Sequence, residues 1–350
     1  MRFPSVVANM FIIREMDLTD SANFMYSAGI SELAAAHGMW TPGTSFDFTR
    51  IYSDGEYAHL YYSGRRMWGA LSLAAPSLRL SPTYANLMTD SPHPYPFAVK
   101  PDAPLNAHDF MATHRSWYAG TPFDMTVGMG AGPFGSPNRY GGGLGELQVA
   151  GSWERSITLF RTGYSFVVEV DPAGSGVPDA TRGTLWFGPH AAHGTAYVPM
   201  ASGGLAVPEP YRRGHQAVMD RQSAFWAHRV VENIANLRFS AMYPHLRNAS
   251  SVLEAKGDAV RAAAYAAYGR VRDAHELTRA LNAHALSVVS EWWQLQDALL
   301  VMYADGYLTT AAAGGVAVSH SIGYPAWWLK AANVGYPNGP PPPPPSAVSA

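Results

Sequence analysis

The segment from Val6 to Met16 is apolar at both alternating sets of positions. Val6 and Met10 belong to one set, and Val7 and Phe11 belong to the other. Successive side chains of a strand point to opposite faces, so a strand that is apolar on both faces is usually buried between two layers. The pattern therefore predicts a buried strand over this segment.

Helical spacing follows in the next hundred residues. Apolar side chains recur three and four apart over residues 21–37 and 62–73, which predicts two helices. Residues 81–104 are rich in proline and have no regular period, so they predict a wrapping loop. Asn106 is a typical helix cap in front of the helically spaced Phe110 and Met111, which predicts a third helix.

Strand patterns return in the middle of the chain and give way to long helices. Residues 156–170 and 184–187 predict two strands joined by the turn at 171–174, and residues 196–198 predict a short third strand. The last third has few helix breakers, and its helices are predicted at residues 223–237, 250–268 and 273–303. Six consecutive prolines, residues 340–345, predict an extended terminal tail.

These elements predict an α+β chain in three parts. The first part, residues 1–210, holds the predicted strands, and the second, residues 211–336, is mainly helical. Residues 337–350 form a proline-rich tail that we expect to be disordered.

Composition narrows the classes of function. Hydrophobic residues make up 47% of the chain and charged residues 14%, which predicts a large core. Lys and Arg number 24 against 26 Asp and Glu, and the absence of a basic run argues against a nucleic-acid partner. No apolar stretch is long enough to cross a bilayer, so we expect no membrane partner. The cysteine count is zero, which excludes disulfides and a cysteine nucleophile within these 350 residues.

Other candidate motifs are weak. His190 and His193 have the spacing of a helical metal pair, but the neighbouring Pro189 and Gly194 favour a turn. The glycines of residues 128–135 match no phosphate-binding fingerprint and favour a pocket-lining or tightly packed loop. The chain has no Gly-x-Ser-x-Gly elbow. We therefore predict neither a cofactor nor a metal.

Seven phrases are specific in combination. They are Phe97-Ala-Val-Lys-Pro-Asp102, Tyr118-Ala-Gly-Thr-Pro-Phe-Asp-Met125, Gly132-Pro-Phe-Gly-Ser-Pro-Asn-Arg139, Trp153-Glu-Arg-Ser-Ile-Thr-Leu-Phe-Arg161, Leu185-Trp-Phe-Gly-Pro189, Ser223-Ala-Phe-Trp226 and Tyr324-Pro-Ala-Trp-Trp328. Their order and content resemble the C-terminal region of the dipeptidase A and secernin family, over a stretch from about Ala8 to Trp328.

The resemblance implies an N-terminal-nucleophile hydrolase that cleaves dipeptides and other short peptides. Its fold would be an α-β-β-α sandwich, here lacking its first strands and followed by a helical extension. The family's nucleophile is a cysteine that opens the first strand, and we expect this chain to begin downstream of it. The chain alone is then inactive, and it needs a missing segment, a partner chain or a second copy to cover its sheets. The alternative is a non-catalytic structural or interaction protein derived from that family.

The resemblance also implies two site residues. In related hydrolases an asparagine of a buried strand donates to the oxyanion, and Asn9 has a similar setting. Its alternative role is a hydrogen bond to neighbouring backbone. Arg139 resembles an arginine beside the nucleophile, where it would lower a thiol pKa or anchor a substrate carboxylate. Its alternative role is a surface ion pair.

One further phrase of the resemblance is interpreted as structural. We expect Glu154 and Arg155 to pair with each other, and Trp153 to anchor the start of a strand.

Overall fold

The computed structural model describes residues 4–53, 60–82, 95–141 and 153–332. The chain divides into two compact units. Unit 1 comprises Met1–Tyr118 and Arg139–Ile157, and unit 2 comprises Ala119–Asn138 and Thr158–Ala350. Helices and two small antiparallel sheets confirm the α+β class. The predicted tail at 337–350 lies outside the described residues, and the boundaries at 210 and 336 stay predictions.

Unit 1 is helical in its described part. Its helix α4 (Ala107–His114) begins at the predicted cap: the Asn106 side chain accepts from the backbone N–H of His108 and Asp109, and the Asp109 carboxylate accepts from the Asn106 N–H in return. The predicted helix over residues 62–73 is confirmed by α3 (Arg65–Ala74), which directly follows a π-helical turn. The helices are α1 (Ile30–Ala36), α2 (Phe48–Tyr52), the π-helical turn (Leu60–Gly64), α3 (Arg65–Ala74), a 3-10 turn (Pro76–Leu78) and α4 (Ala107–His114).

The strand predicted from Val6 to Met16 is wrong. Within the described residues, the strand pairing of this segment is limited to one isolated β-bridge between Glu15 and Asp47. The chain bends at residues 8–10. Ala8 and Met10 pack on Met67 of α3, whereas Val7 is 70% exposed. The alternation is present, but a strand also needs a hydrogen-bonded neighbour, and the described residues offer this segment a helix instead.

The helix predicted over residues 21–37 is wrong in its first half. Asp20 accepts hydrogen bonds from the backbone N–H of Ala22 and Asn23, which closes a local turn. Gly29 adopts a left-handed conformation with φ of 84°, and α1 begins directly after it. The helix therefore forms over only seven residues of the predicted range.

Unit 2 contains a three-stranded antiparallel sheet in the order β1-β2-β3. The strands are β1 (Ser165–Val170), β2 (Gly183–Gly188) and β3 (Val198–Ala201). The strand predicted from residue 156 therefore begins nine residues late. In the skipped part a turn forms between Leu159 and Thr162, and Thr158 is buried in a polar cluster described below. The short helix α5 (Asp179–Arg182) precedes β2.

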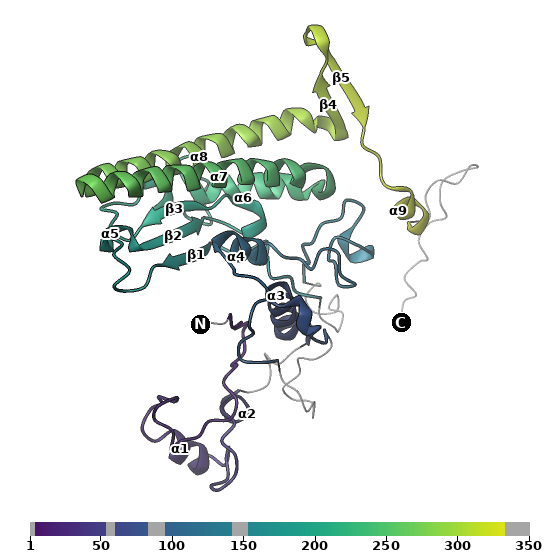
Figure 1. The fold of residues 1–350 in the computed structure, drawn as a ribbon. Helices are drawn as coiled ribbons and strands as arrows, with labels where there is room; N and C mark the ends of the chain where they lie inside the picture. Colours follow the sequence, from purple (N-terminus) through teal and green to yellow (C-terminus); the bar gives the residue numbers. More distant parts are fainter. Residues whose placement is uncertain (1–3, 54–59, 83–94, 142–152, 333–350) are drawn as a thin grey trace. The chain divides into compact units, whose positions relative to one another are not determined.

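Long helices pack on this sheet and on one another (Figure 1). They are α6 (Ala224–Asn236), α7 (Phe239–Val271) and α8 (Ala274–Met302). Their shared core includes Val198 of β3, Val231, Leu246 and Trp292. The three predicted helices are confirmed, although α7 begins eleven residues early and contains Pro244. Burial of Phe239 and Met242 in its first turn offsets the backbone hydrogen bond that the proline removes.

The remaining described residues form a hairpin and a short helix. The hairpin joins β4 (Tyr307–Ala311) to β5 (Ala317–Ser321), and α9 (Ala326–Ala331) follows. Sequence reasoning placed this hairpin inside a mainly helical part and missed both strands. No helix in the described part of the chain is sufficiently long and apolar to cross a membrane.

Candidate functional site

Asn9 is the first predicted site residue, and its amide is held by an arginine. The Asn9 Oδ1 accepts a hydrogen bond of 2.7 Å from Arg66 Nη2. A guanidinium only donates, so the contact fixes the oxygen toward Arg66 and turns the Nδ2 amino group away from it. Asn9 is exposed, and its φ of 59° is left-handed. The prediction that Asn9 lies in a buried strand is therefore wrong. Its Nδ2 amino group, however, is held in one orientation and faces solvent.

Arg66 lies on the first turn of α3 and ties three segments together. Its Nε donates to the Tyr62 carbonyl oxygen at 2.7 Å, and its Nη2 also donates to the Ala8 carbonyl oxygen at 3.3 Å. Its guanidinium carbon lies 4.9 Å from the centre of the Tyr62 ring. Burial and the nearby charge of Arg155 lower the pKa of Arg66 to about 10. The side chain is still a cation at neutral pH.

Arg155 reaches the same aromatic ring. Its guanidinium carbon lies 4.2 Å from the Tyr62 ring centre. The Tyr118 hydroxyl donates to the Arg155 carbonyl oxygen at 2.5 Å and so fixes the backbone from which the side chain extends. Tyr118 itself has a left-handed φ of 66°, which is unusual for a bulky residue and often marks a functional position.

The close approach of Tyr118 to α3 depends on Gly69. A Cβ on Gly69 would lie 2.7 Å from the Tyr118 Cε1 atom, so a side chain there would displace the ring. The sequence thus permits the Tyr118 ring to reach α3 and hold Arg155 at the same time.

The predicted local pair between Glu154 and Arg155 is wrong. Glu154 pairs instead with Arg65 of α3, at 2.7 Å between Oε1 and Nε. Burial raises the pKa of Glu154, and the hydrogen bond and charge of Arg65 act against that shift. Trp153 does not start a strand: it is 54% exposed and lies beside Arg139. The Glu154 carboxylate therefore forms its ion pair with Arg65 and not with Arg155.

Arg139 is the second predicted site residue. Its guanidinium carbon lies 5.8 Å from the centre of the Trp153 ring, and burial lowers the pKa of Arg139. The structure thus gives Asn9 the neighbour Arg66 and gives Arg139 the neighbour Trp153. The roles that the resemblance implies for Asn9 and Arg139 stay predictions.

A separate polar cluster is buried inside unit 2. Glu232 of α6 is 4% exposed, and its Oε1 lies 3.1 Å from His193 Nε2 and 3.2 Å from the donating Asn138 Nδ2. His190 Nε2 is 3.7 Å from Glu232 Oε2, and His193 Nδ1 is 2.6 Å from the Thr158 hydroxyl. The cluster joins α6 to three loops.

The electrostatics of this cluster favour an ionised carboxylate. Burial acts to raise the pKa of Glu232, but the hydrogen bond with His193 and the nearby His190 ring outweigh it and lower the pKa to about 2. Burial lowers the pKa of His190, which holds that ring neutral. Within the described residues, no three His, Cys, Asp or Glu side chains could together hold a metal ion. The cluster therefore serves to hold α6 and the neighbouring loops together.

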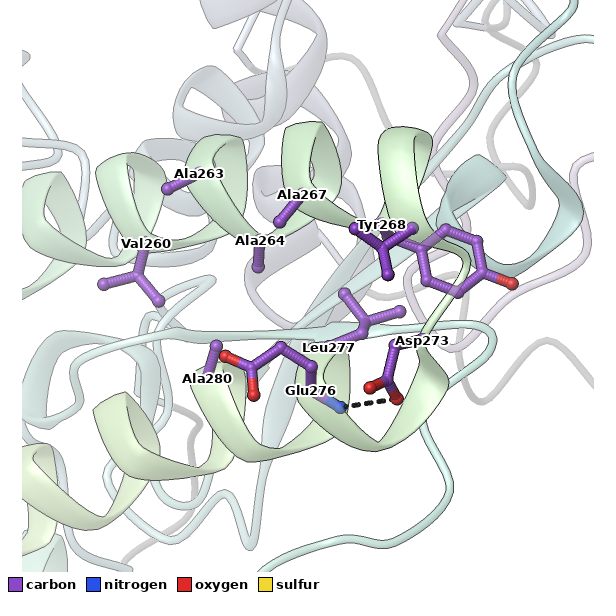
Figure 2. A pocket seen from close by; sticks show the side chains of 10 residues that line it. Val260, Ala263, Ala264, Ala267, Tyr268, Asp273, Glu276, Leu277 and Ala280 are labelled. Carbon is purple, nitrogen blue, oxygen red and sulfur yellow. Dashed lines mark hydrogen bonds between the residues drawn. The ribbon is translucent and has the colours of Figure 1, made fainter.

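A cavity of about 370 Å³ lies between α7 and α8 (Figure 2). Its lining is mainly alanine and other apolar side chains, together with the two acids Asp273 and Glu276. Asp273 caps α8 by accepting from the backbone N–H of Glu276 at 3.1 Å. None of the residues that line this cavity is a nucleophile paired with a base, so it offers no peptide-cleaving chemistry.

Sequence reasoning missed Arg66 and Arg155 as site residues and Glu232 as a buried acid. Arg66 lies outside the seven phrases, and Arg155 was assigned to an ion pair with its neighbour. A helical pattern did mark α6, and Glu232 falls between its buried Val231 and Ala235. An acid on the buried face of a helix signals a polar partner in the core, although its identity depends on the fold.

Comparisons with known proteins match this chain to a peptidase family and to a probable dipeptidase. The model of peptidase family C69 matches residues 3–251, more than half of the chain. A probable dipeptidase of Latilactobacillus sakei is 25% identical over 237 residues, which cover 68% of this chain and 44% of that protein. The match thus spans less than half of that relative's length.

Proposed function

Because the chain belongs to peptidase family C69, we propose that it supplies the carbonyl-binding part of a dipeptide-hydrolysing enzyme. The observation that carries the proposal is the fixed amide of Asn9, whose oxygen is held by Arg66 at 2.7 Å. The exposed Nδ2 is then available to a substrate carbonyl. An amide donor that needs no reorientation stabilises a developing oxyanion effectively.

The proposed reaction is acyl transfer to a thiolate. The thiol gives its proton to a base, and the thiolate attacks the scissile carbonyl, whose oxygen becomes an oxyanion held by Asn9 Nδ2. When the carbonyl re-forms, the C–N bond breaks and the leaving amine takes the proton from that base. Water then hydrolyses the thioester and restores the thiol. The chain contains zero cysteines, so the thiol is supplied from outside these 350 residues. Arg139 is the proposed cation beside that thiol.

The proposal includes the finer fold, one layer of an α-β-β-α sandwich. It is supported by the face of the sheet that presents Phe166, Val168 and Val170, which are 48%, 53% and 68% exposed. A hollow of about 520 Å³ continues this apolar face at Leu185 and Phe187. A second sheet packed on it would bury these side chains. The first strands of that sandwich are not among the strands described in this chain.

A non-catalytic role is the second candidate, and the zero cysteine count favours it. A structural homologue has no need to bind peptides. Binding of dipeptides to the purified chain therefore separates the two candidates, because the catalytic proposal requires it.

We expect the purified chain to release no amino acids from a panel of dipeptides. Acyl transfer needs a nucleophile, and neither a thioether nor a serine without a base beside it replaces a thiolate. Released amino acids are measured by chromatography with and without prior treatment with iodoacetamide. Turnover that copurifies with the chain and survives alkylation would contradict the requirement for an external thiol.

A further inference from the structure

Arg66 and Arg155 of unit 1 form a pair of cations around one aromatic ring. Their guanidinium carbons lie 4.9 Å and 4.2 Å from the Tyr62 ring centre. Because both carbons lie close to the same ring centre, the distance between them is at most the sum of these two distances. Both arginines are half-buried, so part of each residue is exposed to solvent.

This pair has no carboxylate partner among the described residues. The bonds of Arg66 go to the carbonyl oxygens of Tyr62 and Ala8 and to Asn9 Oδ1. Arg155 contacts the face of the Tyr62 ring, which leaves the in-plane N–H groups at the guanidinium edge. The acid nearest in sequence, Glu154, is bound to Arg65.

Two partly desolvated cations without a counter-ion repel each other, and an anion relieves that repulsion. The lowered pKa of Arg66 reflects the same situation, because burial and the charge of Arg155 both disfavour its proton. Paired guanidinium groups bind planar carboxylates through parallel N–H donors. The vacant donors therefore suit a carboxylate.

We propose that Arg66 and Arg155 bind the terminal carboxylate of a dipeptide. This inference rests on the proposed function, since it extends the site at Asn9. Arg66 touches Asn9 directly at 2.7 Å, so the carbonyl donor and the carboxylate anchor are neighbours. In a dipeptide, one residue separates the scissile carbonyl from the terminal carboxylate, and consecutive Cα atoms are about 3.8 Å apart. The close spacing favours dipeptides over longer peptides.

The test is calorimetric titration of the full chain with alanyl-alanine and with alanyl-alanine amide. The amide replaces one carboxylate oxygen by an NH2 group of similar size and so removes the negative charge. The acid should therefore bind roughly 10- to 100-fold more tightly, as expected for a charge-assisted hydrogen bond. The Arg155→Met variant should lose most of this difference, and Arg155→Lys should recover part of it. Arg155 is the better position to change because its side chain makes no bond to Asn9 or Ala8.

Arg79→Met is the matched control, since Arg79 is an exposed arginine of the same unit. It should preserve the preference for the acid. Thermal melting of all variants establishes that they are folded. Equal binding of acid and amide by the unchanged chain would overturn the carboxylate site while leaving the proposed function intact. If neither ligand binds, both proposals are overturned. If the Arg155→Met variant is folded and retains the full preference for the acid, the carboxylate site alone is overturned.

Discussion

At the scale of single residues, the orientation of one amide follows from donor and acceptor chemistry. Arg66 can only donate, and Asn9 can accept only through Oδ1. The left-handed backbone of Asn9 places the side chain over α3, and asparagine tolerates this conformation better than most residues. The contact thus explains both the conformation and the direction of the free amino group.

Asn9→Asp should separate stability from binding. An aspartate carboxylate accepts from Arg66 as the amide does and also adds an ion pair, so the thermal midpoint should stay equal or rise. The carboxylate has no hydrogen to donate, so dipeptide affinity should fall roughly 3- to 10-fold, the cost of one hydrogen bond. Differential scanning fluorimetry and calorimetric titration measure the two effects. A lower midpoint with unchanged affinity would reverse the assignment of the two ends of the side chain.

At the scale of elements, the contact between α6 and the 3-10 turn Ala192–Gly194 depends on one glycine. A Cβ on Gly194 would lie 2.6 Å from both Cβ and Cγ of Glu232. The turn therefore reaches α6 closely enough for His193 to bond Glu232 only if residue 194 has no side chain. The bond between His193 and Glu232 therefore depends on a glycine at position 194.

Gly194→Ala should destabilise unit 2 by about 1–3 kcal/mol, the usual cost of overpacking a core. Equilibrium unfolding in urea gives the change in free energy. Gly163→Ala is the matched control, because a Cβ there meets no atom within 4 Å, and it should change the free energy little. Equal stability of the two variants would show that the turn moves freely away from α6.

At the scale of the whole molecule, buried histidines tie stability to pH. His190, His228 and His284 are 2%, 0% and 4% exposed, and burial lowers the pKa of each, for His228 to about 3. The folded chain holds these rings neutral, whereas the unfolded chain protonates them below about pH 6.5. Protons therefore favour unfolding, and stability falls as the pH drops below that value. Glu232 adds a further loss between its ordinary pKa of 4.5 and about 2.

His228→Phe should weaken this pH dependence. Phenylalanine keeps a ring against Trp292, which stacks on His228 at 4.6 Å, but it binds no proton. Between pH 6.5 and pH 4 the slope of unfolding free energy should become smaller by up to about 1.4 kcal/mol per pH unit. Urea unfolding at several pH values measures the slope, with the exposed His275→Phe as the control. If unfolding free energy depends on pH with the same slope in His228→Phe and in the unchanged chain, His228 does not contribute to the pH dependence.

The sequence by itself determined the family, the α+β class and the long helices. The helical periods of α6, α7 and α8 and the cap of α4 are local, so they could be predicted without knowing the fold. The seven phrases identified the family, and the family match over residues 3–251 agrees with them. The absence of cysteine was also decided at this level, because composition does not depend on folding.

The tertiary structure decided which polar side chains meet. The segment at Val6 alternates like a strand, yet it lies against Met67 because strand formation depends on a hydrogen-bonded neighbour elsewhere in the chain. Arg66 and Arg155 are 89 residues apart and meet at Tyr62, while Tyr118 packs on Gly69 of α3 and bonds the Arg155 backbone. Glu154 pairs with Arg65 rather than with its neighbour for the same reason. Contacts distant in sequence leave no local pattern, so these pairings could be found only in the folded chain.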